Sequence, residues 1–411
     1  MKAEHFRFCG NEMQYLKEVL DSGFISSTTG SMNRRLEDAF AQRFGVNFAI
    51  TVNSATSGLH AALAACEVKP GDEVILPALT VVMCGYAVIQ AGATPVFADV
   101  DNKTFVIDIS DVERKITPKT KAIMVVNLYG LMVDMDKVME IARKHNLYVI
   151  EDCAQAFLST DDKDRIAGTV GHIGVYSFEN SKHMSTGDGG IVVTNSELLA
   201  ERVRKFAGMG FKNIKANFGQ VRKNKDILQD PQYLRHDTFG FNYRLTELAA
   251  AVGLGQLERL DDLVSLRQKM AQKFITAIEE TGCTYLIPQQ VPAGYINSYF
   301  TFAARFEGLE QKGITWYDFR KKFVEYGKDG IYSAWALVYN EPCMQMLNEE
   351  GRFFKDIEGQ GVYHKGYLQE INCPMAEELQ PKLMQFPTNQ GSEADMDIQV
   401  NALRNTILYC R

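Results

Sequence analysis

One lysine and one carboxylate lie where two apolar runs of the sequence end, and both could take part in chemistry. Lys182 lies in the run Ser177–His183, and the glycine-rich stretch Gly187–Gly190 follows it. Burial or a neighbouring positive charge lowers the pKa of a lysine, and such an amine can form an imine with a carbonyl compound. A single lysine in a loop is more often exposed to solvent, so this motif alone does not define a site.

The carboxylate is Asp152, in the motif Glu151–Gln155 that follows the apolar run Tyr148–Ile150. Ligands of open α/β sheets bind beyond the carboxyl ends of the strands. A carboxylate there can keep a ring nitrogen protonated, because opposite charges close together favour the charged forms of both groups. A carboxylate that only caps the following helix explains these residues equally well.

Two further motifs could bind an anion. Asn53–Gly58 has small and hydroxyl residues at a predicted helix start, where free N–H groups and the helix dipole favour a phosphate. Gly240–Glu247 places an amide, Asn242, and an arginine, Arg244, before a long predicted helix. Taken singly, an ordinary N-cap and an ordinary turn are the better interpretations of these two motifs.

The elements that must position these residues follow an α/β pattern. Ser54–Cys66, Val82–Gln90 and Met135–His145 have the spacing of helices and alternate with short apolar runs. Runs that are apolar on both faces are typical of strands buried in a parallel sheet. These predicted strands are Val74–Leu76, Pro95–Phe97, Ile123–Val126, Tyr148–Ile150 and Gly174–Phe178.

The pattern changes after Arg204. Lys212–Asp237 is polar and is predicted to be a long loop, and Leu245–Phe274 has the spacing of long helices. We therefore expect an α/β fold with a large domain, residues 1–255, whose mainly parallel central sheet is flanked by helices, and a smaller C-terminal α+β domain, residues 256–411. Roughly the first 25 residues could pack on the smaller domain.

Composition excludes several classes of protein. The 411 residues are 46% hydrophobic and 23% charged, and the net charge of −7 argues against binding to nucleic acid. No apolar stretch reaches the ~20 residues of a membrane-spanning helix, and the N-terminus lacks the features of a signal peptide. The eight scattered cysteines predict reduced thiols in a cytoplasmic protein and argue against a metal site.

The order and spacing of the four motifs resemble the DegT/DnrJ/StrS family of pyridoxal-phosphate-dependent sugar aminotransferases, which has the fold of the aspartate aminotransferase superfamily (fold type I). The resemblance runs from about Gly30 to about Arg267 and continues more faintly to Cys373–Glu377. Further matching runs are Pro77–Thr80, Ala91–Asp99 and Asn127–Gly130.

The resemblance implies roles for individual residues. Lys182 would form the imine with the cofactor, and Asp152 would pair with its pyridine nitrogen. Asn242 would reach the phosphate from the other subunit, which implies a homodimer with shared active sites. The remaining predicted cofactor contacts are Gln155 at the ring and Ala55, Thr56 and Ser177 at the phosphate.

The implied reaction is a ping-pong transamination from glutamate or glutamine to a keto-sugar, most simply a nucleotide-linked one. Cyclitol amination and sugar dehydration on the same fold are the alternatives. Some relatives that dehydrate sugars have histidine in place of the lysine, whereas this chain keeps Lys182 and has His183 one residue later. A non-catalytic regulator would need neither Lys182 nor Asp152, and a nicotinamide-dependent oxidoreductase would need a G-x-G-x-x-G motif that is missing.

Three positions depart from the family pattern. Val81 stands where an aromatic residue often stacks on the cofactor, Asn127 replaces a histidine, and Ala55 replaces a glycine. Tyr86 could compensate for Val81. We expect Val81 and Asn127 to tune the ring side or the substrate side of the site. The candidate substrate contacts are Tyr129, His183, His364 and the loop Lys212–Asp237.

Overall fold

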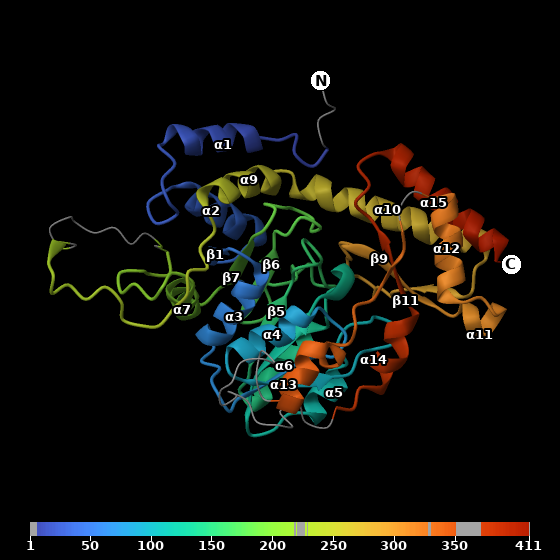
Figure 1. Ribbon diagram of the computed structural model, residues 1–411, viewed down its shortest axis with the longest axis horizontal. Coiled ribbons are helices and arrows are strands. Elements are labelled where there is room, and N and C mark those ends of the chain that lie inside the picture. The colour runs from blue at the N-terminus through green and yellow to red at the C-terminus, as the bar shows by residue number, and fades with distance from the viewer. Residues whose placement is uncertain are drawn as a thin grey trace.

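The computed structural model describes residues 6–217, 219, 227, 229–327, 330–350 and 371–410. These residues form two sheets, each with its own hydrophobic core (Figure 1). The mixed α/β architecture with a large, mainly parallel sheet confirms the predicted fold class. Within the described residues, no helix is both long enough and apolar enough to cross a membrane.

The large sheet has seven strands, and the five that run in parallel carry the predicted apolar runs. The two strands that were not predicted, β1 and β7, are antiparallel to their neighbours at one edge. The strand order is β1 (Phe48–Val52), β7 (Gly190–Thr194), β6 (Ile173–Ser177), β5 (Tyr148–Asp152), β4 (Thr120–Val126), β2 (Glu73–Pro77) and β3 (Thr94–Ala98).

The predicted helices of the large domain form with their expected bounds. The hydroxyl of Ser54 accepts a hydrogen bond from the amide of Ser57 at 3.1 Å and so caps α3 (Ala55–Ala65). Gly58 lets this helix approach the sheet, because a Cβ atom at that position would lie 2.8 Å from Val175. The other helices of this part are α2 (Met32–Phe44), α4 (Val82–Gln90), α5 (Ile109–Arg114), α6 (Met135–His145) and α7 (Glu197–Ala207).

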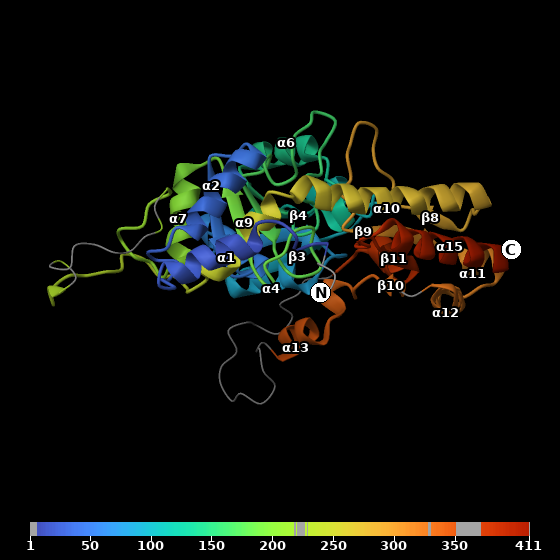
Figure 2. The same cartoon turned by 90° about the horizontal axis from the view of Figure 1, so that it is seen from above.

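The small sheet is antiparallel throughout. Its strand order is β10 (Tyr332–Ser333), β11 (Leu383–Pro387), β9 (Thr301–Phe306) and β8 (Leu286–Pro288). Helices α10 (Leu260–Thr281), α12 (Trp316–Tyr326) and α15 (Glu393–Tyr409) pack with this sheet, and α11 (Gly308–Lys312) follows β9. The two views show α10 running from the large sheet to the small one (Figures 1 and 2).

Two segments pack differently from the simple division at residue 255. Helix α1 (Glu12–Asp21) packs on α9 (Glu247–Leu257) and so lies with the large sheet, whereas Phe6, earlier in the chain, lies against Gly391. Helices α13 (Pro342–Glu350) and α14 (Pro374–Leu379) return to the core of the large sheet.

Candidate active site

Lys182 lies in the loop between β6 and β7 and is half-buried. Its Nζ atom lies 4.4 Å from the centroid of the Phe300 ring. Burial lowers the pKa of this amine, the carboxylates of Asp152 and Glu179 oppose that effect, and the guanidinium of Arg267 adds to it. The amine therefore loses its proton more readily than an exposed lysine does.

Asp152 ends β5 and is buried. Its Oδ1 atom accepts a hydrogen bond from the amide of Ala154 at 3.0 Å, and its Oδ2 atom accepts one from the thiol of Cys84 at 3.1 Å. Burial raises the pKa of this carboxyl, against the effect of these two hydrogen bonds and of the charge on Lys182. A buried carboxylate of this kind gains most when a cation comes to lie beside it.

The predicted phosphate residues meet at the ends of β6 and β7. Ser177 pairs with Gly190, and a Cβ atom at position 190 would lie only 2.8 Å from the backbone nitrogen of Ala55. Glycine at this position therefore lets the start of α3, Ala55 and Thr56, approach Ser177. The first N–H groups of a helix have no partner within the helix, so they can bind an anion here.

Gln155, three residues after Asp152 in the sequence, is buried. Its Oε1 atom accepts a hydrogen bond from the backbone amide of Tyr129 at 2.8 Å. Tyr129 adopts a positive φ of 62° and is fully buried. The prediction that Tyr129 contacts substrate is therefore not supported, because its ring belongs to the core.

Asn242 is the predicted site residue that the single chain does not bring to the others. Its side chain is exposed, in a turn whose neighbour Tyr243 accepts a hydrogen bond from the amide of Asn53 at 2.7 Å. The turn thus lies beside the loop that enters α3, while Asn242 itself faces outward.

Two polar neighbours of the site, His183 and Asn127, form hydrogen bonds within the protein, but Nδ1 of His183 is buried and has no hydrogen-bond partner among the described residues. His183 is buried, and its Nε2 atom lies 3.0 Å from the carbonyl oxygen of Ser298. Because a carbonyl oxygen can only accept, Nε2 is the donor of this hydrogen bond. Asn127 is also fully buried and accepts from the amide of Val133 at 2.9 Å. Asn127 therefore holds the turn after β4, and the expectation that it tunes the ring side or the substrate side of the site stays a prediction. His364 and the loop residues 218, 220–226 and 228 lie outside the described residues.

Sequence reasoning missed Cys84, Phe300 and Arg267, which all lie beside Asp152 or Lys182. None of them belongs to a local motif, and each comes to the site from a distant element. A single sequence carries no signal for such residues, because only the folded chain brings them next to Asp152 and Lys182.

A cavity of about 680 Å³ opens beside the Lys182 loop. Its lining includes Ser181, next to Lys182, together with Arg267, Phe300, Trp335 and Asn389. The cavity is large enough for a substrate and lies next to the lysine.

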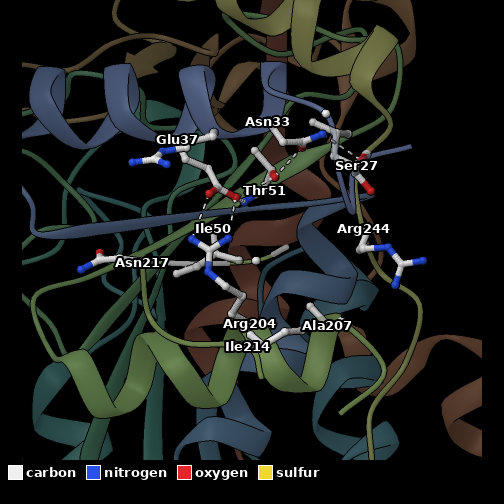
Figure 3. Close-up of a pocket in the computed structure, with 15 residues that line it drawn as sticks. Ser27, Asn33, Glu37, Ile50, Thr51, Arg204, Ala207, Ile214, Asn217 and Arg244 are labelled. Atoms are coloured by element: carbon white, nitrogen blue, oxygen red, sulfur yellow. Dashed lines mark hydrogen bonds and ion pairs between the residues drawn. The ribbon is translucent and has the colours of Figure 1, made fainter. Parts of the chain in front are cut away.

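A second, smaller cavity lies between α2, β1 and α7 (Figure 3). There the carboxylate of Glu37 pairs with the guanidinium of Arg204 at 2.9 Å and accepts a hydrogen bond from Thr51 (Figure 3). Arg244 and three residues of the Lys212–Asp237 loop, Ile214, Asn217 and Gly219, also line this cavity, whereas none of the predicted cofactor contacts does. The network of Glu37, Thr51 and Arg204 joins α2, β1 and α7.

The residues present fit pyridoxal phosphate. A buried carboxylate suits the protonated ring nitrogen, a helix start beside a serine suits the phosphate, and a half-buried amine suits the aldehyde. The fold and this donor set define a pyridoxal-phosphate-dependent aminotransferase of fold type I.

Residues 9–400 match the DegT/DnrJ/EryC1/StrS aminotransferase family, and the chain belongs to this family. It is 43% identical over 262 residues to a GDP-perosamine synthase of Escherichia coli O157:H7. This alignment covers 64% of this chain and 67% of that protein. It is 42% identical over 267 residues to a GDP-perosamine synthase of Caulobacter vibrioides, covering 64% and 66%. The structure of an aminotransferase from Psychrobacter cryohalolentis superposes with a TM-score of 0.82, at 29% identity and 97% coverage of both chains.

Proposed function

We propose that this protein transfers an amino group from glutamate or glutamine to a GDP-linked keto-sugar and releases a GDP-linked amino sugar. The observation that carries the proposal is the half-buried amine of Lys182 with the carboxylate of Asp152 near it. The relatives named GDP-perosamine synthase support the choice of substrate, because an aminotransferase that makes an amino sugar must start from the corresponding keto-sugar.

Each residue of the proposed site has one task. When bound, pyridoxal phosphate supplies an electron sink for the carbon that loses its proton. Asp152 would keep the proton on the ring nitrogen, and the start of α3 with Ser177 would hold the phosphate. The Nζ atom of Lys182 would hold the cofactor and, once the amino donor displaces it, would itself take up the proton that the α-carbon of the donor loses. In the second half of the cycle the same amine moves a proton in the reverse direction.

The cavity beside Lys182 supports a bulky acceptor. Its outer wall includes Trp335 and Tyr332, whose side chains are 39% and 61% exposed. Exposed aromatic faces in a cavity are suited to stacking on a sugar or a base. His183 does not favour the dehydratase alternative, because it is buried and bonded to Ser298.

We further infer that the protein is a homodimer in which Asn242 contacts the phosphate of the partner's cofactor. Asn242 belongs to the segment between α7 and α9, whose described part projects from the body of the chain in both views (Figures 1 and 2). This segment exposes apolar side chains, namely Leu234, Phe239 and Phe241. Exposed apolar side chains that lie close together mark a surface that another protein covers.

We also propose two domains, residues 1–255 and 256–411, and a cytoplasmic location. The eight cysteines are all free, which suits a reducing compartment.

The function is tested by incubating the purified protein with a GDP-linked keto-sugar and glutamate or glutamine and following the products by mass spectrometry. We expect a GDP-linked amino sugar and an equal amount of the keto acid. Lys182→Ala should abolish both products, whereas Lys144→Ala, which changes an exposed lysine of α6, should not. Keto acid formation without any aminated sugar across a panel of keto-sugar nucleotides would contradict the proposed acceptor.

A further inference from the structure

Arg267 is a buried cation that the proposed reaction does not use. Arg267 is 5% exposed, and its hydrogen bonds among the described residues go to carbonyl and hydroxyl oxygens, none of them to a carboxylate. Burying a guanidinium in this way is costly unless several oxygen atoms replace the lost water. Burial, with Arg7 nearby, lowers the pKa of Arg267 to about 9, so it remains protonated at neutral pH.

The oxygen atoms around Arg267 come from both parts of the molecule. Nη2 donates to the carbonyls of Ser181 at 2.6 Å and Lys182 at 3.2 Å, in the loop of the large sheet. Nη1 donates to the carbonyl of Phe300 at 2.6 Å and to the hydroxyl of Thr388 at 3.3 Å. Phe300 precedes β9 and Thr388 follows β11, so these two belong to the small sheet.

The place of Arg267 on its helix matches this division. Val264, one turn earlier on α10, packs in the core of the large sheet, and Met270, one turn later, packs in the core of the small sheet. Arg267 therefore lies where α10 passes from one core to the other. A planar guanidinium with several fixed donors can bridge such segments, which a lysine ammonium cannot do in the same geometry.

A second arginine binds the same loop. Arg7 donates to the carbonyl of Asn180 at 2.5 Å and to that of Lys182 at 2.6 Å. The N-terminal segment that carries Arg7 is itself held by Arg259, which donates to the carbonyls of Phe6 and Arg7. Two guanidinium groups thus converge on the carbonyl of Lys182.

We propose that Arg267 is a positioning residue that couples the small antiparallel sheet to the loop of the reactive lysine, and that Arg7 supports the same loop. This proposal rests on the proposed role of Lys182. A shift of β9 or β11 relative to the large sheet is passed through Arg267 to the Lys182 backbone. The small domain thereby controls where the amine stands.

Arg267 also acts on the charge of the amine. The groups that face Lys182 are Asp152 at the end of β5, Glu179 and His183 in its own loop, Cys84 on α4 and Arg267 on α10. Positive charge disfavours the protonated amine, so removal of Arg267 raises the pH at which the nitrogen gains its proton.

The test compares the unmodified holoenzyme with the variants Arg267→Met and Arg267→Lys. The control is Arg404→Met, which removes a different arginine contact to α10. Arg404 lies on α15 and pairs with Glu280 of α10. For Arg267→Met we expect amide exchange of residues 178–186 to rise about fivefold or more, and the midpoint of the pH-dependent cofactor absorbance to rise by about one unit. The value of kcat should fall about tenfold or more, while KM for the amino donor changes less than about threefold.

Arg267→Lys separates the two effects. It keeps the charge and loses the bridge, so the midpoint should stay near that of the wild type while amide exchange of the loop rises. If Arg267→Met does not fold, the variants Arg7→Met and Arg267→Lys test the proposal instead. In both we expect faster amide hydrogen exchange of residues 178–186 than in the wild type.

The outcomes keep the two proposals distinct. If borohydride reduction of the wild type marks a lysine other than Lys182, the proposed site fails and the role of Arg267 fails with it. If the reduction marks Lys182, but loop exchange and midpoint in the folded Arg267 variants equal those of Arg404→Met, only the role of Arg267 is overturned.

Discussion

The thiol of Cys84 lies 3.1 Å from Oδ2 of Asp152, and both side chains are buried. Cys84 is on α4 and Asp152 ends β5, so helix and strand meet at the carboxylate that we propose pairs with the cofactor ring. The thiol bond counteracts the rise in the pKa of Asp152 that burial causes.

Cys84→Ala should therefore raise the pKa of Asp152 further. The carboxylate then gains its proton at a higher pH. The acid limb of the kcat profile should therefore move to higher pH by about half a unit. Cys84→Ser keeps a donor and should leave the acid limb in place. Profiles of kcat between pH 5 and 8 for both variants check this, and coincident acid limbs for the alanine and serine variants would count against the bond.

Asp152→Asn tests the carboxylate directly. The amide cannot keep the ring nitrogen protonated, so kcat should fall about 100-fold or more with the cofactor still bound. Asp162→Asn, which changes an exposed aspartate, is the control. Cofactor absorbance and steady-state rates measure both properties, and near-normal turnover in Asp152→Asn would remove this residue from the mechanism.

His60 makes stability depend on pH. It lies on α3, with Nδ1 3.1 Å from the hydroxyl of Tyr243, and burial lowers its pKa to about 4. Below its ordinary pKa of about 6.5 the unfolded chain binds a proton that the folded chain does not. The free energy of unfolding should therefore fall as the pH drops from about 6.5 to about 4, by at most about 2–3 kcal/mol.

His60→Gln should flatten this part of the curve, and His145→Gln, at an exposed position, should leave it unchanged. Urea unfolding at pH 7, 6 and 5 measures the difference. An equal loss of stability in wild type and His60→Gln would contradict the assignment.

Gly30 permits a buried cap. The carboxylate of Glu247 accepts hydrogen bonds from the amides of Met32 at 2.7 Å and Asn33 at 3.2 Å, at the start of α2. A Cβ atom at position 30 would lie 2.1 Å from this carboxylate. Gly30→Ala should lower the free energy of unfolding by about 2–4 kcal/mol.

Gly330→Ala is the matched control, because its Cβ atom would meet only Arg320, at 3.6 Å. Its cost should stay below about 1 kcal/mol. Thermal unfolding of both variants decides, and equal costs would show that the cap does not constrain this glycine.

The sequence predicted those parts of the fold and site that depend on neighbours along the chain. The parallel strands and the helices α3, α4 and α6 have local apolar patterns, and Asp152 and Lys182 follow such strands. Strands β1 and β7 were missed because each is a five-residue strand, antiparallel to its neighbours, that lies between stronger signals along the chain. The burial of Tyr129 and Asn127 could not be foreseen, since both are enclosed by segments distant in sequence.

The long-range partners were also beyond reach. Cys84 and Asp152 lie far apart in the sequence, and so do Lys182 and Arg267. No local or periodic pattern of residues therefore indicates that either pair is in contact. The same holds for the return of α13 and α14 to the large sheet, which depends on bonds such as that from the amide of Ala376 to Asp99 at 2.7 Å.

The central claim is that the amine of Lys182 holds the cofactor covalently, and borohydride reduction of the purified holoenzyme followed by peptide mass spectrometry tests it most directly. The account predicts one pyridoxyl-modified peptide, with the modification on Lys182, and none in Lys182→Ala. A modification on any other lysine in the wild type, or undiminished trapping in Lys182→Ala, would contradict it.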